Sequence, residues 1–228
     1  MNIQVVMADD HPVLLSGMDH MLAGIPDIDV AGLASNSTEL VELLERQVSV
    51  DVVVTDFSMP HGRHGDGITL LRLLGRRYPK LRRVVLTGVE SSWILRSILD
   101  VHVSVIVSKT DPHHLLEPAI RAAYAGHAYL SPEVERLVRE AQAGGGAPDG
   151  AALTKRETEV LRMYAEGLTV SEIGDRVGRS RKTVSTQKLS AMRKLGLQGD
   201  AEIFQYAMMH GLVLASQVSR GHVAGTHN

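Results

Sequence analysis

The alternation of short β-branched runs with helical segments over residues 1–125 constrains the fold more than any other feature. The runs occupy residues 3–8, 28–34, 51–56, 83–88 and 103–108. Between them lie segments with apolar residues at helical spacing, such as TELVELLERQ and ITLLRLLGRRY. Strands that alternate with helices are typical of an α/β fold with a parallel sheet. Because the strands are apolar throughout, helices are expected to cover both faces.

The rest of the chain has a different composition. Residues 126–152 contain AQAGGGAPDGAA, which predicts a flexible linker, with SPEVERLVREAQ before it as a short helix. From residue 153 every segment is helical in pattern, and Thr154 with Glu157 has the spacing of a capping box. We therefore predict an all-α helix-turn-helix domain over 153–215 and a disordered tail over 216–228.

Charge divides the chain in the same way. Residues 1–143 carry 13 Lys and Arg against 18 Asp and Glu, whereas residues 144–228 carry 11 against 8. Residues 176–194 hold seven basic side chains and no acid, which favours an anionic partner such as double-stranded DNA. The chain has no Cys, so disulfides and thiolate sites are excluded. It has no apolar run of about 18 residues, so no membrane span is expected and the cytoplasm is the expected compartment.

Polar residues follow the strands at matching ends. Asp9 and Asp10 follow the first strand and Asp56 ends the third. Thr87 ends the fourth strand and Lys109 follows the fifth. In a doubly wound sheet of order 2-1-3-4-5 these ends are neighbours, so the side chains should converge. A lone strand-end Asp is more often a helix cap, but the coincidence of five such residues favours a Mg²⁺ site for phosphoryl transfer.

These residues carry a family resemblance. The segments ADDHP (8–12), DFSMP (56–60), LTG (86–88) and SK (108–109) resemble the motifs of two-component receiver domains, whose sheet has the flavodoxin-like order 2-1-3-4-5. The resemblance, over residues 1–125, implies that Asp56 is the phosphoacceptor and that Thr87 and Lys109 bind the phosphoryl group. It implies Mg²⁺ ligands from Asp9, Asp10, Asp56 and the Ser58 carbonyl. Ile106 stands where the family has a switch aromatic.

The helix expected over residues 180–196 has the length and charge of a major-groove helix. Its apolar side is predicted to comprise Val184, Leu189, Met192 and Leu195. Basic residues near its N-terminus are expected to contact the DNA backbone, namely Arg179, Arg181 and Lys182, and Thr183 is a further expected DNA contact. Side chains that could reach base edges or a thymine methyl group are Ser185, Thr186, Lys188 and Leu189.

Residues 153–196 resemble the LuxR-type output domain of the NarL/FixJ family of response regulators, with Gln187 where many members have His. The resemblance implies a dimer surface on the helix over 200–214, although core packing explains its apolar residues equally well. MPHGRHGDGITL is four residues longer than the usual receiver loop and resembles the Rcs-type capsule-synthesis regulators. The resemblance implies that this chain takes phosphate from a histidine kinase or a His-phosphotransfer protein, and that it forms a homodimer or a heterodimer with an auxiliary LuxR-type regulator.

Two alternatives remain at this point. A Mg²⁺-dependent aspartyl-phosphate hydrolase usually has a second Asp two residues after the nucleophile, and here that residue is Ser58. The chain is therefore expected not to be an enzyme, apart from accepting a phosphoryl group and losing it slowly. The second alternative is a regulator that binds DNA independently of phosphate, together with auxiliary partners.

Overall fold

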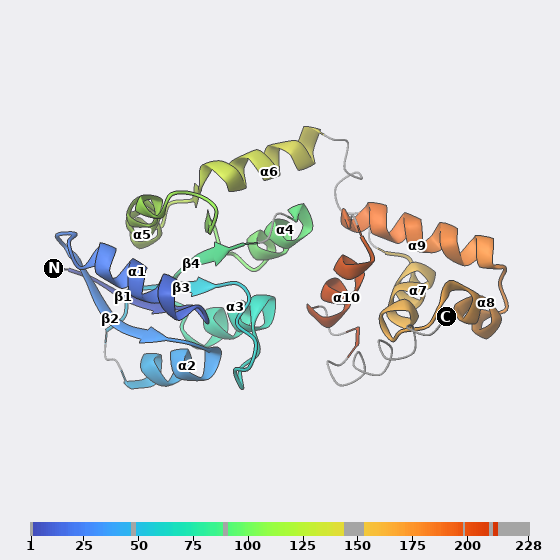
Figure 1. The fold of residues 1–228 in the computed structure, drawn as a ribbon, viewed down its shortest axis with the longest axis horizontal. Helices are drawn as coiled ribbons and strands as arrows, with labels where there is room; N and C mark the ends of the chain where they lie inside the picture. The colour runs from blue at the N-terminus through green and yellow to red at the C-terminus, as the bar shows by residue number, and fades with distance from the viewer. Residues whose placement is uncertain are drawn as a thin grey trace. The chain divides into compact units, whose positions relative to one another are not determined.

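The computed structural model describes residues 2–46, 49–88, 91–143, 153–197, 199–209 and 212–213. The chain divides into two compact units, residues 1–140 and 141–228. Figure 1 shows an α/β unit that contains the sheet and a second unit built from helices. No helix among the described residues is long and apolar enough to cross a bilayer.

The first unit contains a six-stranded sheet of order β2-β1-β3-β4-β5-β6 in which all neighbouring strands are parallel. The strands are β1 (Ile3–Ala8), β2 (Ile28–Ala34), β3 (Val52–Asp56), β4 (Arg82–Thr87), β5 (Val105–Ser108) and β6 (Tyr129–Leu130). The predicted order of the first five strands is confirmed. The sixth strand is a correction: the sequence predicted five, and the two residues of β6 are too few to leave a strand pattern.

Helices cover both faces of the sheet, as the apolar strands require. On one face α1 (Pro12–Leu22) and α5 (Leu116–Ala125) pack through Leu15, Met18, Leu22, Leu116 and Ile120. On the other face α2 (Ser37–Arg46) and α3 (Gly67–Arg77) pack through Leu40, Leu44, Leu70 and Leu74. The helix α4 (Ser92–Asp100) buries Trp93, Ile94, Leu95 and Ile98, and the short 3₁₀ helix η1 (His113–Leu115) precedes α5.

The segment expected as a linker, 126–152, begins with regular structure. After β6, the helix α6 (Pro132–Ala143) occupies the position of the predicted short helix. Residues 144–152 lie outside the described residues, as does the tail 216–228 that was expected to be disordered.

The second unit contains α7 (Lys155–Ala165), α8 (Val170–Val177), α9 (Arg181–Leu195) and α10 (Asp200–Met209). Local hydrogen bonds determine where these helices start. Thr154 and Glu157 form the predicted capping box, and Ser180 caps α9 by accepting from the Thr183 N–H. Gly178 ends α8 with a φ of 64°, a conformation that favours glycine, and the tight turn into α9 follows.

Candidate functional site

The register of the parallel sheet brings the polar strand ends together. Ala8, just before Asp9, pairs with Thr55, just before Asp56. Thr87 at the end of β4 pairs with Ser108, just before Lys109. Because all these strands run in one direction, their carboxyl ends meet at the same edge of the sheet. The predicted convergence of Asp9, Asp56, Thr87 and Lys109 follows from this register.

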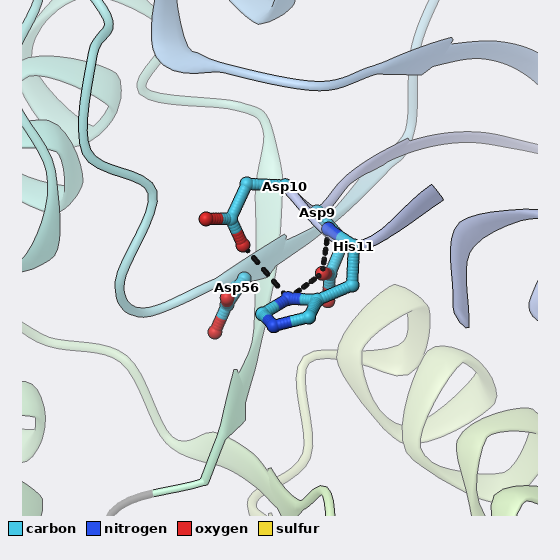
Figure 2. A group of neighbouring side chains, drawn as sticks. All are labelled: Asp9, Asp10, His11 and Asp56. Atoms are coloured by element: carbon cyan, nitrogen blue, oxygen red, sulfur yellow. Dashed lines mark hydrogen bonds and ion pairs between the residues drawn. The ribbon is translucent and has the colours of Figure 1, made fainter. Parts of the chain in front are cut away.

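The centre of the site is an ion-pair network around Lys109. Its Nζ lies 2.7 Å from Asp56 Oδ2 and 2.7 Å from Asp9 Oδ2. Both carboxylates are almost fully buried, and the lysine side chain is 17% exposed. Figure 2 shows Asp9, Asp10 and Asp56 grouped around one point, with His11 beside them. Buried carboxylates of this kind require a cation nearby, and Lys109 supplies one.

Burial changes the protonation behaviour of this network. Burial raises the pKa of Asp56, and the hydrogen bond and charge of Lys109 offset only part of that effect. For Lys109, burial lowers the pKa of the ammonium, but its contacts with Asp56 and Asp9 outweigh burial and leave it raised. Lys109 therefore stays charged. Additional positive charge at the cluster would favour the ionised form of Asp56.

The donor set fits a hard cation. One ligand atom from each of Asp9, Asp10, His11 and Asp56 lies within 4.8 Å of the others. Three of the four are carboxylates, and oxygen-rich donors are those that Mg²⁺ prefers. His11 Nδ1 lies 2.8 Å from Asp10 Oδ1 and 3.0 Å from Asp9 Oδ1. His11 was not among the residues predicted for this site, although its place directly after Asp10 was a signal.

The remaining residues of the site lie around this cluster. Thr87 is 1% exposed at the end of β4, and Ser58 follows Asp56 in the loop after β3. A backbone hydrogen bond from Ser58 lowers the pKa of Asp56, although burial dominates. Ile106 is fully buried in β5. The site therefore has a packed aliphatic side chain at the position of the expected aromatic.

The four-residue extension after Asp56 is attached to α2. A Cβ added at Gly62 would lie 1.9 Å from Ser37 Oγ and 2.7 Å from the Ser37 backbone nitrogen. The next residue, Arg63, donates its backbone N–H to Thr38 Oγ1 at 2.8 Å. On either side of this contact, His61 is exposed and His64 is half-buried. The extension is thus held against the start of α2 and presents His61 and Arg63 to solvent.

The second unit presents a basic surface on and before α9. Arg179, Arg181, Lys182 and Thr183 are all exposed, which is compatible with the DNA contacts predicted for them. Within the described part of the chain, no ion pair involves Arg179, Arg181 or Lys182. Cations without protein partners remain available to phosphates. Thr183 Oγ1 also lies 2.9 Å from Ser180 Oγ, so it supports the cap of α9.

Two neighbouring residues of α9 differ from their expected orientation. Leu189, placed on the apolar side, is 57% exposed and shares a face with Thr186 and the half-buried Ser185. This exposure fits the second expectation for Leu189, contact with bases. Lys188, expected to reach DNA, is only 12% exposed. It lies four residues after the buried Val184, which places both on the inner face of the helix.

The Lys188 ammonium has partners inside its own unit. Its Nζ lies 2.6 Å from Asp200 Oδ1 and 3.7 Å from the centre of the Tyr164 ring. The Tyr164 hydroxyl donates to Asp200 Oδ2 at 2.7 Å. Lys188 therefore joins α9 to α7 and α10, an inward position that differs from the DNA contact predicted for it.

A second buried network holds α9 against α7. Glu157, 6% exposed, accepts hydrogen bonds from Ser190 Oγ and Lys194 Nζ, each at 2.8 Å. Burial alone would raise the pKa of Glu157, but Lys194 and the Thr154 cap lower it to about 2. The sequence pattern indicates Glu157 only as half of a capping box. In the fold it also anchors the basic helix.

The helix α10 contributes to the core and to the surface. Ile203 is buried and Phe204 is half-buried, whereas Met208 is 41% exposed. Core packing therefore accounts for Ile203. The exposed Met208 remains available to a dimer surface of the predicted kind.

Comparison with known proteins supports both units. Residues 5–120 match the family described as response regulator receiver domain, and residues 151–207 match the family described as bacterial regulatory proteins, luxR family. The transcriptional regulatory protein RcsB of Escherichia coli is 38% identical over 205 residues, which cover 90% of this chain and 94% of the relative. The response regulator UvrY of Escherichia coli is 28% identical over 219 residues, covering 95% and 99% of the two chains.

Solved structures give the same assignment. One is RcsB from Salmonella enterica serovar Typhimurium bound to a promoter in the presence of phosphomimetic BeF₃⁻. Its TM-score is 0.83 with 37% identity, covering 92% of this chain and 100% of that one. A structure of two RcsB dimers bound to two parallel DNAs has a TM-score of 0.81 with 37% identity, covering 92% and 99%.

Proposed function

The chain belongs to the response regulators that join a receiver domain to a LuxR-type DNA-binding domain, and we propose that phosphoryl transfer to Asp56 controls its binding to double-stranded DNA. One observation carries the proposal. The only lysine within reach of the buried Asp56 among the described residues, Lys109, contacts both Asp56 and Asp9 at 2.7 Å. A nucleophilic carboxylate is thus placed beside a cation that can bind the transferred group.

In the transfer, an Asp56 carboxylate oxygen forms a bond to phosphorus while the phosphorus–nitrogen bond of a phosphohistidine breaks. The electron pair of the broken bond goes to the leaving nitrogen, and a proton from water completes the neutral imidazole. Lys109 neutralises the phosphoryl oxygens, and Thr87 donates a hydrogen bond to one of them. Mg²⁺ bound by Asp9, Asp10, Asp56 and the Ser58 carbonyl would reduce the repulsion between carboxylate and phosphoryl oxygens.

The phosphoryl donor is a histidine kinase or a His-phosphotransfer protein. The chain itself is a regulator rather than an enzyme, and its only chemistry is acceptance and slow loss of the phosphoryl group. Loss of the phosphoryl group is expected to be slow, because the residue two positions after Asp56 is Ser58. Its hydroxymethyl side chain cannot act as the general acid of a phosphatase.

The DNA interface is the exposed face of α9. Arg179, Arg181 and Lys182 would contact phosphates, with Thr183 beside them at the helix start. Ser185, Thr186 and Leu189 would face the bases in the major groove. One of the related structures solved on DNA contains RcsB dimers. If this chain forms a homodimer through α10, the dimer would cover the exposed apolar side chain of Met208. A heterodimer with an auxiliary LuxR-type regulator would use the same helix.

The test compares wild type with Asp56→Ala after incubation with acetyl phosphate and Mg²⁺. Phos-tag electrophoresis and intact mass would report aspartyl phosphate, and a mobility shift would report DNA binding. We expect phosphate on wild type only, with tighter DNA binding after phosphorylation. Asp51→Ala is a matched control, because Asp51 directly precedes β3, at the end of the strand opposite Asp56. Wild-type protein without phosphate on Asp56 would overturn the proposal.

A phosphate-independent regulator is the second candidate, because the buried Ile106 lacks the bulk of the family's switch aromatic. In that case Asp56→Ala and phosphorylated wild type would bind DNA equally. The same gel therefore separates the two functions.

A further inference from the structure

The pairing of the edge strand β6 with β5 is extended by the side chain of Ser131. Tyr129 N–H donates to the Ser104 carbonyl at 2.9 Å, and Ser131 N–H donates to the Ile106 carbonyl at 3.0 Å. The next backbone donor of β5, the Ser108 N–H, is accepted by Ser131 Oγ at 2.9 Å. Ser131 is fully buried and Ser108 is 7% exposed. A buried N–H needs such a partner, so this hydroxyl replaces the carbonyl of a longer strand.

This hydrogen bond lies one residue from Lys109. The Lys109 N–H donates to the Thr87 carbonyl at 2.8 Å, on the other side of β5. The end of β5 is therefore fixed from two sides, by Thr87 of β4 and by Ser131. The backbone that carries the Lys109 ammonium toward Asp56 depends on both contacts.

The same contact fixes the start of α6. Ser131 accepts the Glu135 N–H through its carbonyl at 2.9 Å, which closes the first turn. The Glu133 N–H donates to Asp111 Oδ2 at 3.1 Å, in the loop that follows β5. The first turn of α6 is thus attached to the residues on either side of Lys109. Along the chain, α6 is the last described element before α7.

We infer that Ser131 is a positioning residue for Lys109, and that through it the first turn of α6 responds to phosphorylation of Asp56. The inference rests on the proposed roles of Asp56 and Lys109. A phosphoryl group on Asp56 requires the ammonium to leave the carboxylate for the phosphoryl oxygens. The end of β5 adjusts with it, and the Ser108–Ser131 hydrogen bond passes the adjustment to α6. The bound group thereby favours one of two arrangements of α6.

Ile106 strengthens this assignment. Its side chain is buried and aliphatic, and its carbonyl is one of the two β5 groups that bind Ser131. The strand position at which the receiver family carries a switch aromatic is here joined to α6 through the backbone.

The experiment uses the full chain in four forms: wild type, Ser131→Ala, Ser131→Thr and Ser104→Ala. Ser131→Ala removes the acceptor and Ser131→Thr retains a hydroxyl. Ser104→Ala is the matched control, because the Ser104 side chain is exposed on the neighbouring part of the same segment. The main readout is the ratio of DNA affinities with and without phosphorylation, measured at equal aspartyl-phosphate content. Hydrogen exchange of the α6 amides with and without phosphate is the second.

We expect Ser131→Ala to reduce the phosphorylation-dependent gain in DNA affinity about tenfold, as loss of one buried hydrogen bond would. We also expect it to abolish the phosphate-dependent change in exchange on α6. Ser131→Thr should restore both readouts, and Ser104→Ala should match wild type. A merely structural serine would lower the melting temperature without changing the affinity ratio.

A wild-type ratio and wild-type exchange in Ser131→Ala would overturn the inference. If Ser131→Ala does not fold, Asp111→Ala serves instead, because it keeps Ser131 and removes the half-buried acceptor of the Glu133 N–H. That variant removes the attachment of α6 to the loop after β5, and a wild-type ratio in it would overturn the coupling of α6 to the end of β5. Absence of aspartyl phosphate on the wild type would be a different result, since it would overturn the proposed function from which the inference starts.

Discussion

Lys188 of α9 and Asp200 at the start of α10 form an ion pair of 2.6 Å beneath the exposed face of the basic helix. Burial lowers the pKa of Lys188, but Asp200 and Tyr164 raise it overall, so the ammonium stays charged. The pair sets the position of α9 from the inside, whereas Arg181 and Lys182 lie on the outside. The basic residues of α9 thus have two separable roles: Lys188 holds the helix in its own unit, and Arg181 and Lys182 are available to DNA.

Salt dependence distinguishes these roles. Each phosphate contact contributes about 0.9 to the slope of log affinity against log salt. We expect Lys182→Met to reduce the magnitude of that slope by about 0.9, the contribution of one phosphate contact. Lys188→Met should weaken DNA binding and reduce stability by about 1 kcal/mol with an unchanged slope. Fluorescence anisotropy across a salt series measures this, and a reduced slope in Lys188→Met would return Lys188 to the DNA interface.

Glu157→Gln should destabilise the second unit by about 2 kcal/mol, because Lys194 would lose its charged partner in a nearly buried site. Glu159→Gln is the matched control, since Glu159 is exposed on the same helix. Urea unfolding followed by far-UV circular dichroism reports both units. The single tryptophan, Trp93, reports the first unit alone. Equal unfolding midpoints for the two variants would contradict the role given to Glu157.

Glu157 also predicts a pH dependence. Its pKa is about 2 in the fold and near the ordinary value of 4.5 in the unfolded chain. A depressed pKa stabilises the fold at pH values above the unfolded pKa. This contribution should therefore be complete above about pH 5 and should disappear as the pH falls from 4.5 toward 2. Unfolding free energies of wild type and Glu157→Gln should converge over this range. A constant difference between them would exclude the linkage.

Gly62→Ala should destabilise the first unit by about 1–3 kcal/mol, because the added Cβ would meet the Ser37 side chain and backbone. Gly17→Ala is the contrasting control: Gly17 lies in α1 and its Cβ would meet nothing within 4 Å. That change should stabilise the helix by about 0.5–1 kcal/mol. Thermal unfolding followed by Trp93 fluorescence measures both. A stable Gly62→Ala protein would show that the extension is not held against α2.

The sequence predicted the first five strands within about two residues because each is a buried, β-branched run of ordinary length. It also predicted which polar residues meet, since parallel strands bring equivalent ends together. The contacts of His11 were not predicted, because strand periodicity says nothing about a side chain that lies beyond the strand end.

The orientations of Lys188 and Leu189 were less predictable. The spacing from Val184 to Lys188, Met192 and Leu195 was a signal for an inward lysine. The residue type favoured an outward orientation, because lysine is rarely buried without a partner. The partner, Asp200, belongs to the next helix, and only the packed fold brings it to Lys188. Ser131 was missed for the same reason, since its donor lies 23 residues earlier.

The short strand β6 has a practical consequence for isolating the receiver. The matched family region ends at residue 120, and a fragment cut there or at residue 125 would lack β6 and Ser131. The outward N–H and C=O groups of β5 would then form a bare strand edge, which can pair with a second copy and aggregate. A fragment that continues to residue 140 retains the natural cover of that edge. Self-association seen only in the shorter fragment would therefore be an artefact of truncation.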